Sequence, residues 1–170
     1  MSKNVLVLDT TVLACWLRVP RRLTCGPEDD RWDYGRINNL LDAERDRRST
    51  FVLPVATLIE TGNHIAQAGG DRFQLAQGLT QILDACLDSE EPWAAFEHQA
   101  ELWGADKLRR LSNEWPQLAS QGLGIGDATI KDVAEYYSKT GSFNVQILTG
   151  DKGLKSYEPA APVPVPRRRR

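Results

Sequence analysis

The segment that most limits the fold is the apolar run Asn4–Leu8, which reads NVLVL and ends at Asp9. An uninterrupted apolar run of this length is typical of a strand buried on both faces. Thr10 and Thr11 come next and can cap a helix, because an apolar stretch follows them as far as Leu17. A strand that passes directly into a helix places Asp9 at the carboxyl end of that strand.

Strand and helix patterns alternate along the rest of the chain. Short apolar runs predict strands at 51–53 and 145–148. The expected helices cover residues 34–48, 55–68, 73–87, 92–118 with a break at Pro116, and 127–140. This alternation predicts an α/β fold in which a parallel sheet lies under layers of helices.

The length of 170 residues fits one domain, which we place at 1–158. Residues 159–170 form a separate tail, with proline at nearly every second position up to Pro166 and then four arginines, Arg167–Arg170. Such a tail cannot pack as a helix or strand, so we expect an extended, flexible arm. It can bind single-stranded RNA, dock on another protein or only aid solubility.

Composition describes a soluble globular protein, with 41% hydrophobic and 26% charged residues and a mean hydropathy of -0.42. No apolar run approaches the roughly 20 residues of a membrane helix, and Asp9 interrupts the first apolar run too early for a signal peptide. We therefore expect a cytoplasmic protein with no membrane segment. The three cysteines show no CxxC spacing and are expected as reduced thiols.

The net charge of -2 does not attract a polyanion to the whole molecule. Without the four terminal arginines, 17 cations face 23 acids. A nucleic-acid partner must therefore be held by local basic patches, or by a metal ion that offsets clustered acids.

Four acidic residues are expected at one rim of the sheet. Asp9 and Asp151 follow apolar strands, while Glu60 and Asp127 lie near the starts of helices. Ligands of parallel sheets bind at the carboxyl edge. Two carboxylates about 5 Å apart repel by roughly 3 kcal/mol at an effective dielectric of about 20. Convergence therefore requires raised pKa values or a divalent cation, although each acid alone is also a normal helix-start or turn residue.

A set of carboxylates without cysteine or histidine favours one or two Mg²⁺ or Mn²⁺ ions. Such ions suit phosphodiester hydrolysis, because they lower the pKa of a bound water and stabilise the attacking and leaving oxygens.

These segments together resemble the PIN (PilT N-terminus) domain family. The resemblance spans residues 5–154 and is carried by Asp9-Thr10-Thr11, Glu60, Asp127-Ala128 and Thr149-x-Asp151-x-x-Leu154, in the family's order. It implies a three-layer α/β/α sandwich with a central parallel sheet, and a metal-dependent endoribonuclease. The layout is similar to VapC-like toxins of toxin–antitoxin pairs, which implies an antitoxin or other inhibitory protein partner and a homodimer.

The resemblance also implies the roles of the site residues. By this resemblance, the catalytic metal ligands, direct or through water, are Asp9, Glu60, Asp127 and Asp151. It places the Thr149 hydroxyl near a metal-bound water, and it assigns Thr10 or Thr11 a hydrogen bond that orients Asp9. Two departures are Thr11, where the family often has Asn or Ser, and a long, Trp-rich segment at 88–126.

Other residues are weaker candidates for substrate contact. His64 follows Glu60 by one helical turn, and Lys152 is next to Asp151, but a packed histidine and a solvated turn lysine are equally ordinary. Two basic clusters are candidate RNA-facing patches, Arg45-Arg47-Arg48 and Lys107-Arg109-Arg110. Such clusters are also typical of solvated helix ends. Trp93 and Trp103 are expected in the core.

Two other functions compete with the nuclease. A catalytically silent PIN-like scaffold that binds RNA or protein has no need to keep all four acids. A phosphatase of the haloacid-dehalogenase type needs a second Asp two positions after the first, where Thr11 stands. Metal binding distinguishes the nuclease from the scaffold, whereas the RNA target and the number of ions stay open.

Overall fold

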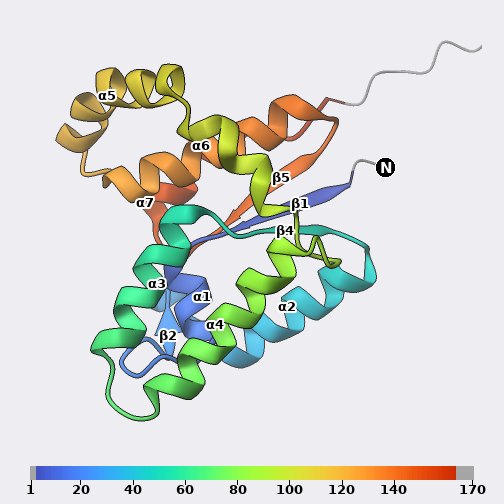
Figure 1. Ribbon diagram of the computed structural model, residues 1–170, viewed down its shortest axis with the longest axis vertical. Coiled ribbons are helices and arrows are strands. Elements are labelled where there is room, and N and C mark those ends of the chain that lie inside the picture. The colour runs from blue at the N-terminus through green and yellow to red at the C-terminus, as the bar shows by residue number, and fades with distance from the viewer. Residues whose placement is uncertain (1–2, 164–170) are drawn as a thin grey trace, which may run out of the picture.

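The computed structural model describes residues 3–163, and its centre is a three-stranded parallel sheet with helices on both faces (Figure 1). The strand order is β4 (Thr50–Val52), β1 (Asn4–Leu8), β5 (Asn144–Leu148). Because both pairings are parallel, the carboxyl ends of the three strands meet at one edge. The predicted α/β class with a central parallel sheet is confirmed.

The central strand β1 is buried on both faces, as its apolar run predicts. Val5, Leu6, Val7 and Leu8 are each at most 1% exposed. Leu6 and Leu8 belong to one hydrophobic cluster, while Val5 and Val7 belong to another. The alternation of side chains along the strand therefore divides the core into two layers.

Two groups of helices cover these layers. The cluster around Leu6 and Leu8 is completed by helices α1 (Thr10–Trp16), α2 (Tyr34–Asp46), α3 (Val55–Gln67) and α4 (Arg72–Leu87). The opposite cluster is completed mainly by α6 (Ile125–Thr140) and the short α7 (Lys152–Lys155). Each of these helices except α7 was expected, with ends shifted by a few residues.

The segment 92–118 differs from the single helix that its sequence predicts. Residues 92–94 run beside β4, where the amide of Phe51 donates to the Pro92 carbonyl at 2.8 Å and the Ala94 amide donates to the Phe51 carbonyl at 2.8 Å. A 3₁₀ helix, η2 (Phe96–Trp103), ends at Gly104, and α5 (Ala105–Ser120) follows it.

The predicted break at Pro116 is wrong, because α5 continues through it. A proline inside a helix removes one backbone hydrogen bond. No residue of α5 is buried, so water can reach the carbonyl that Pro116 leaves without a partner. The loss is therefore small enough for the helix to persist, far from the sheet at the top of Figure 1.

The loop after α1 also contains structure that the sequence did not indicate. An antiparallel pair is formed by β2 (Thr24–Cys25) and β3 (Trp32–Asp33), with a 3₁₀ turn, η1 (Glu28–Asp30), between them. All three cysteines are free thiols, as expected. In the tail, residues 159–163 form no helix or strand, and Arg167–Arg170 lie outside the described residues. Within residues 3–163, no helix is long and apolar enough to cross a membrane.

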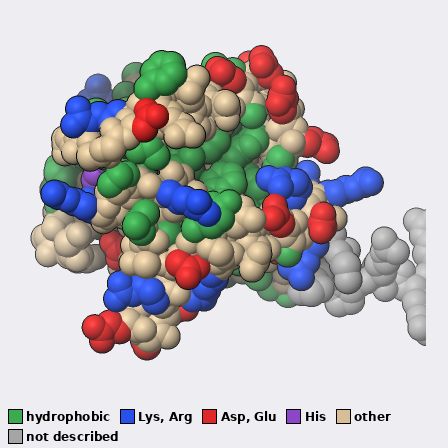
Figure 2. Space-filling view, turned by 90° about the horizontal axis from the view of Figure 1, so that it is seen from below, with side chains coloured by type: hydrophobic (Ala, Val, Ile, Leu, Met, Phe, Trp, Pro, Cys, Tyr) green, Lys and Arg blue, Asp and Glu red, His purple; other side chains and the backbone are tan. Residues whose placement is uncertain are grey.

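The tryptophans occupy different environments. Trp93 packs against the core, with its ring edge-to-face with Phe51 at a centroid separation of 5.6 Å, as predicted. Trp103 is 39% exposed, so its expected place in the core is wrong. A groove between α1, α2 and α4 is lined by Trp16, Ile82 and Trp93, among others. Figure 2 views the molecule from the side of these helices, and hydrophobic side chains there gather in a central hollow.

Gln99 fixes the turn that leads from β4 into α3. Its side chain is only 2% exposed, its Nε2 donates to the Leu53 carbonyl at 2.7 Å, and its Oε1 accepts from the Val55 amide at 3.2 Å. These two hydrogen bonds satisfy the backbone carbonyl before Pro54 and the backbone amide after it. Gln99 therefore positions the start of the helix that carries Glu60.

We expect Gln99→Met to lower the free energy of unfolding by about 2 to 4 kcal/mol, because it keeps the side-chain volume and removes both hydrogen bonds. Urea denaturation followed by circular dichroism measures this change. The matched control is Glu97→Gln, on the exposed face of η2. Equal urea midpoints for Gln99→Met and the unmodified chain would contradict the role of Gln99.

Candidate functional site

Asp9 is held firmly at the carboxyl edge of the sheet. It caps α1, is 3% exposed, and its backbone amide donates to the Leu148 carbonyl at 2.9 Å. Its Oδ2 accepts from the Thr11 hydroxyl at 2.7 Å and from the Thr149 hydroxyl at 2.8 Å. The predicted orienting donor is therefore Thr11.

Glu60 reaches the same edge from α3. The Thr10 hydroxyl donates to its Oε2 at 2.9 Å, so Thr10 orients Glu60 rather than Asp9. The Thr57 hydroxyl donates to the Leu8 carbonyl at 2.8 Å and ties α3 to the end of β1. A side chain at Gly126 would overlap the Glu60 carboxylate, so glycine at this position lets the start of α6 approach α3 closely.

Asp127 lies in the first turn of α6 and is influenced by the other three acids. Burial first, and then the charges of Asp9, Asp151 and Glu60 in that order, together raise its pKa to about 6. Like-charge effects of this kind fall off steeply with distance. The structure therefore brings the four sequence-predicted acids into one electrostatic neighbourhood.

Asp151 is the most exposed of the four acids. It caps α7, where its Oδ1 accepts from the Gly153 amide at 2.6 Å. Its own backbone amide donates to the Thr149 hydroxyl at 2.9 Å, and that hydroxyl donates to Asp9. Thr149, expected near a metal-bound water, thus links Asp9 to the turn that carries Asp151.

The four carboxylates are of the chemical type that binds a hard divalent cation. Their side chains, however, are not placed to hold one. Within residues 3–163, no group of three or more His, Cys, Asp and Glu side chains is placed to hold a metal ion. One oxygen of each of Asp9, Glu60 and Asp151 is engaged by the protein, whereas their other oxygens accept no hydrogen bond in the described chain. The acids must move closer together before three of them can share an ion.

The two weaker substrate candidates lie near the acids without contacting them. His64 is half-buried one turn after Glu60 on α3, and it forms no hydrogen bond within the part of the chain that is described. Lys152 begins α7, and its Nζ lies 3.6 Å from the Asp29 carboxylate, with both side chains exposed.

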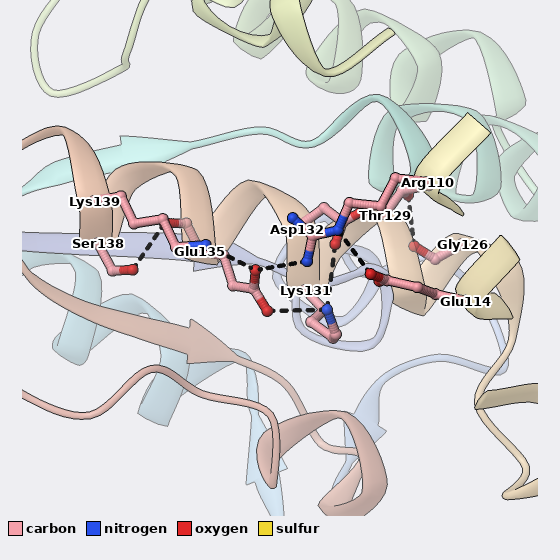
Figure 3. A network of polar contacts seen from close by, with 9 residues as sticks. All are labelled: Arg110, Glu114, Gly126, Thr129, Lys131, Asp132, Glu135, Ser138 and Lys139. Carbon is pink, nitrogen blue, oxygen red and sulfur yellow. Dashed lines mark hydrogen bonds and ion pairs between the residues drawn. The ribbon is translucent and has the colours of Figure 1, made fainter. Parts of the chain in front are cut away.

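The predicted basic patches are partly neutralised. Arg110 is paired with Glu114 at 2.8 Å and lies 3.7 Å from Glu135, which links α5 to α6 (Figure 3). In the other patch, Arg45 pairs with Asp42 and Arg47 pairs with the buried Glu44.

The same network contains a buried cation. Lys131 is 8% exposed and donates to Glu135 at 2.9 Å (Figure 3). Burial alone would lower its pKa, but hydrogen bonds and charge from Glu135 and Asp132 outweigh that effect and raise the pKa of Lys131. Lys131 is therefore engaged by two acids of its own helix, α6.

Cys25 is a neighbour of the site that sequence reasoning missed. Burial raises its pKa to about 12, with additional effects from Cys15 and Asp9, so the thiol is protonated at neutral pH. It lies on β2, in the segment between α1 and α2, and no spacing in the sequence indicates its position. A protonated thiol beside Asp9 adds no charge to the acidic edge.

Comparisons with protein-family models, curated proteins and solved structures find no match to this chain. Its function must therefore be argued from the residues and their arrangement alone.

The raised pKa of Asp127 predicts a pH-dependent stability. Between its ordinary pKa of 3.8 and about 6, the folded state binds more protons than the unfolded state, so the free energy of unfolding falls as pH rises. In a chelator, we expect a fall of about 2 to 3 kcal/mol from pH 4 to pH 6.5 that Asp127→Asn removes. Urea midpoints across this range measure it, with the exposed Asp84→Asn as control. Parallel pH profiles of Asp127→Asn and the unmodified chain would refute the proximity of the acids.

Proposed function

We propose that the protein is a PIN-like, metal-dependent endoribonuclease that hydrolyses RNA phosphodiester bonds. The observation that carries this proposal is the neighbourhood of Asp127, where burial, and after it the charges of three other carboxylates, raise the pKa of this acid at the carboxyl edge of a parallel sheet. Such an arrangement disfavours its own charges unless a cation offsets them. Because neighbouring carboxylate charges are unfavourable without a cation, acids at one edge favour a metal site over a purely structural role.

In this proposal the four acids hold one or two Mg²⁺ or Mn²⁺ ions. A metal held by these acids would supply a water ligand of lowered pKa and would offset charge on the phosphate. Asp9 is the fixed ligand, because two hydroxyls and the sheet immobilise it. Glu60 and Asp151 supply their unbonded oxygens, and Asp127 gives up its proton when a cation binds. Thr11 and Thr149 orient Asp9.

We further propose that this nuclease is the toxin of a toxin–antitoxin pair, with an inhibitory partner at the acidic edge and a homodimeric state. Exposed apolar side chains that neighbour the acids in sequence support a protein partner on these helices. Ile59 precedes Glu60 and is 56% exposed, and Ile125 lies two residues before Asp127 and is 51% exposed. A partner segment that covers these side chains also blocks RNA.

A catalytically silent PIN-like scaffold is the second candidate. The observation that favours it is the separation of the acids, because no three of them are placed to hold an ion within residues 3–163. In that case the edge binds RNA or protein without cutting, and metal has no role.

Incubation of the purified chain with a mixed RNA pool tests the nuclease. We expect cuts with Mg²⁺ or Mn²⁺, none with chelator, and at least a 100-fold lower rate in Asp9→Asn and in Asp127→Asn. Asp84→Asn, an exposed acid on α4, should cut at the unmodified rate. Cuts that persist in both site variants would indicate a contaminating nuclease and would leave the proposal without support.

Calorimetric titration with Mn²⁺ separates the nuclease from the scaffold. We expect heat of binding at pH 7, together with proton release because Asp127 is partly protonated there. Asp9→Asn should weaken the affinity at least tenfold, since it replaces the most firmly held oxygen donor. An unmodified chain with no Mn²⁺ heat, or the same heat in Asp9→Asn, would favour the scaffold.

A further inference from the structure

A cavity of about 770 Å³ lies at the amino edge of the sheet, opposite the acidic edge. Its walls come from the residues before β1 and β5, the end of α2, the turn after α4, the start of η2 and the last turns of α6. Sites for small organic ligands have volumes in this range. None of the four acids of the candidate site lines it.

The cavity contains cations that can bind an anion. Its cations are Lys3, Arg45 and Arg48, with His98 nearby, and its acids are Glu91 and Glu97. Arg45 is paired with Asp42 at 2.8 Å. Lys3 and Arg48 form no ion pair within the described part of the chain, so both are available to a ligand. Arg48 comes from the Arg45-Arg47-Arg48 cluster that the sequence singled out.

Three aromatic side chains also line this cavity, those of Trp93, Tyr136 and Phe143. Trp93 is held edge-to-face by Phe51, and Tyr136 is held edge-to-face by Tyr137 at a centroid separation of 5.3 Å. The ring of Phe143 packs so close to Gly141 that a Cβ there would lie 2.6 Å from it. Rings fixed in this way are suited to stacking on a planar ligand.

Tyr137 contributes an unsatisfied polar group. It is 6% exposed and lines the cavity, and its hydroxyl has no hydrogen-bond partner within residues 3–163. A buried hydroxyl without a partner is unfavourable and uncommon in folded proteins. A polar atom of a ligand is one means of satisfying it.

We propose that this cavity binds a nucleotide, with the phosphate at Lys3 and Arg48 and the base among Trp93, Tyr136 and Phe143. Inorganic phosphate uses only the cations, and a nucleoside uses only the rings, whereas a nucleotide uses both. A free nucleoside monophosphate and the terminal nucleotide of an RNA strand offer the same chemistry. The site is separate from the acidic edge and does not depend on the proposed nuclease activity.

Isothermal calorimetry on the full chain in chelator tests the proposal, because divalent ions then play no part. We expect AMP to bind at least tenfold more tightly than adenosine or inorganic phosphate. Arg48→Gln should weaken AMP about tenfold through loss of a charge-assisted hydrogen bond. Arg109→Gln, an exposed arginine on α5, and Asp9→Asn at the acidic edge should bind AMP as the unmodified chain does.

A 5′-phosphorylated tri-adenylate separates the two sources of the nucleotide. Binding of the trinucleotide alone, weakened by Arg48→Gln, would assign the site to an RNA end and support the proposal. The proposal is overturned if neither ligand binds at millimolar concentration, or if Arg48→Gln binds as tightly as the unmodified chain. Adenosine or phosphate that binds as tightly as AMP overturns it too, as does loss of AMP binding in Asp9→Asn.

Discussion

The fixed position of Asp9 is the constraint on which the rest of the acidic edge depends. Its backbone amide extends the β1–β5 ladder through the Leu148 carbonyl, and its Oδ2 accepts hydroxyl protons from Thr11 and Thr149. One carboxylate thus joins the start of α1 to the end of the last strand, 140 residues later in the chain. The other acids come from elements that pack around this junction, so their positions follow from the parallel sheet and from close approach at Gly126.

The two edges of the sheet differ in chemistry because different elements end at each. At the carboxyl edge, loops and helix starts contribute acids, whose charges add to the effect of burial in raising the pKa of Asp127. At the amino edge, the end of α2 and the last turns of α6 contribute cations and aromatic rings around a cavity. The short β1 strand of five residues separates the two by a distance on the order of 17 Å. Ligands at the two edges therefore need not compete for the same side chains.

Features that depend on local pattern could be predicted from the sequence. The apolar run of β1 and the spacing in α3 and α6 correctly located these elements, and the edge rule for parallel sheets predicted that Asp9 and Asp151 follow strands that end at the same edge. Features that depend on packing could not. The strand-like path at 92–94 needs Phe51 as a partner, and α5 tolerates Pro116 only because no residue of the helix is buried. The hydroxyl assignments depend on the direction in which Thr10 and Thr11 leave the first turn of α1, which spacing alone does not give.

Helix α5 has a practical consequence for work with this chain. It contributes no buried side chain, and ion pairs such as Arg110 to Glu135 hold part of it to α6. Surface ion pairs weaken in salt and add little to folding. The outward face of α5 is therefore a place where a fluorophore, an affinity handle or an inserted peptide disturbs neither edge of the sheet.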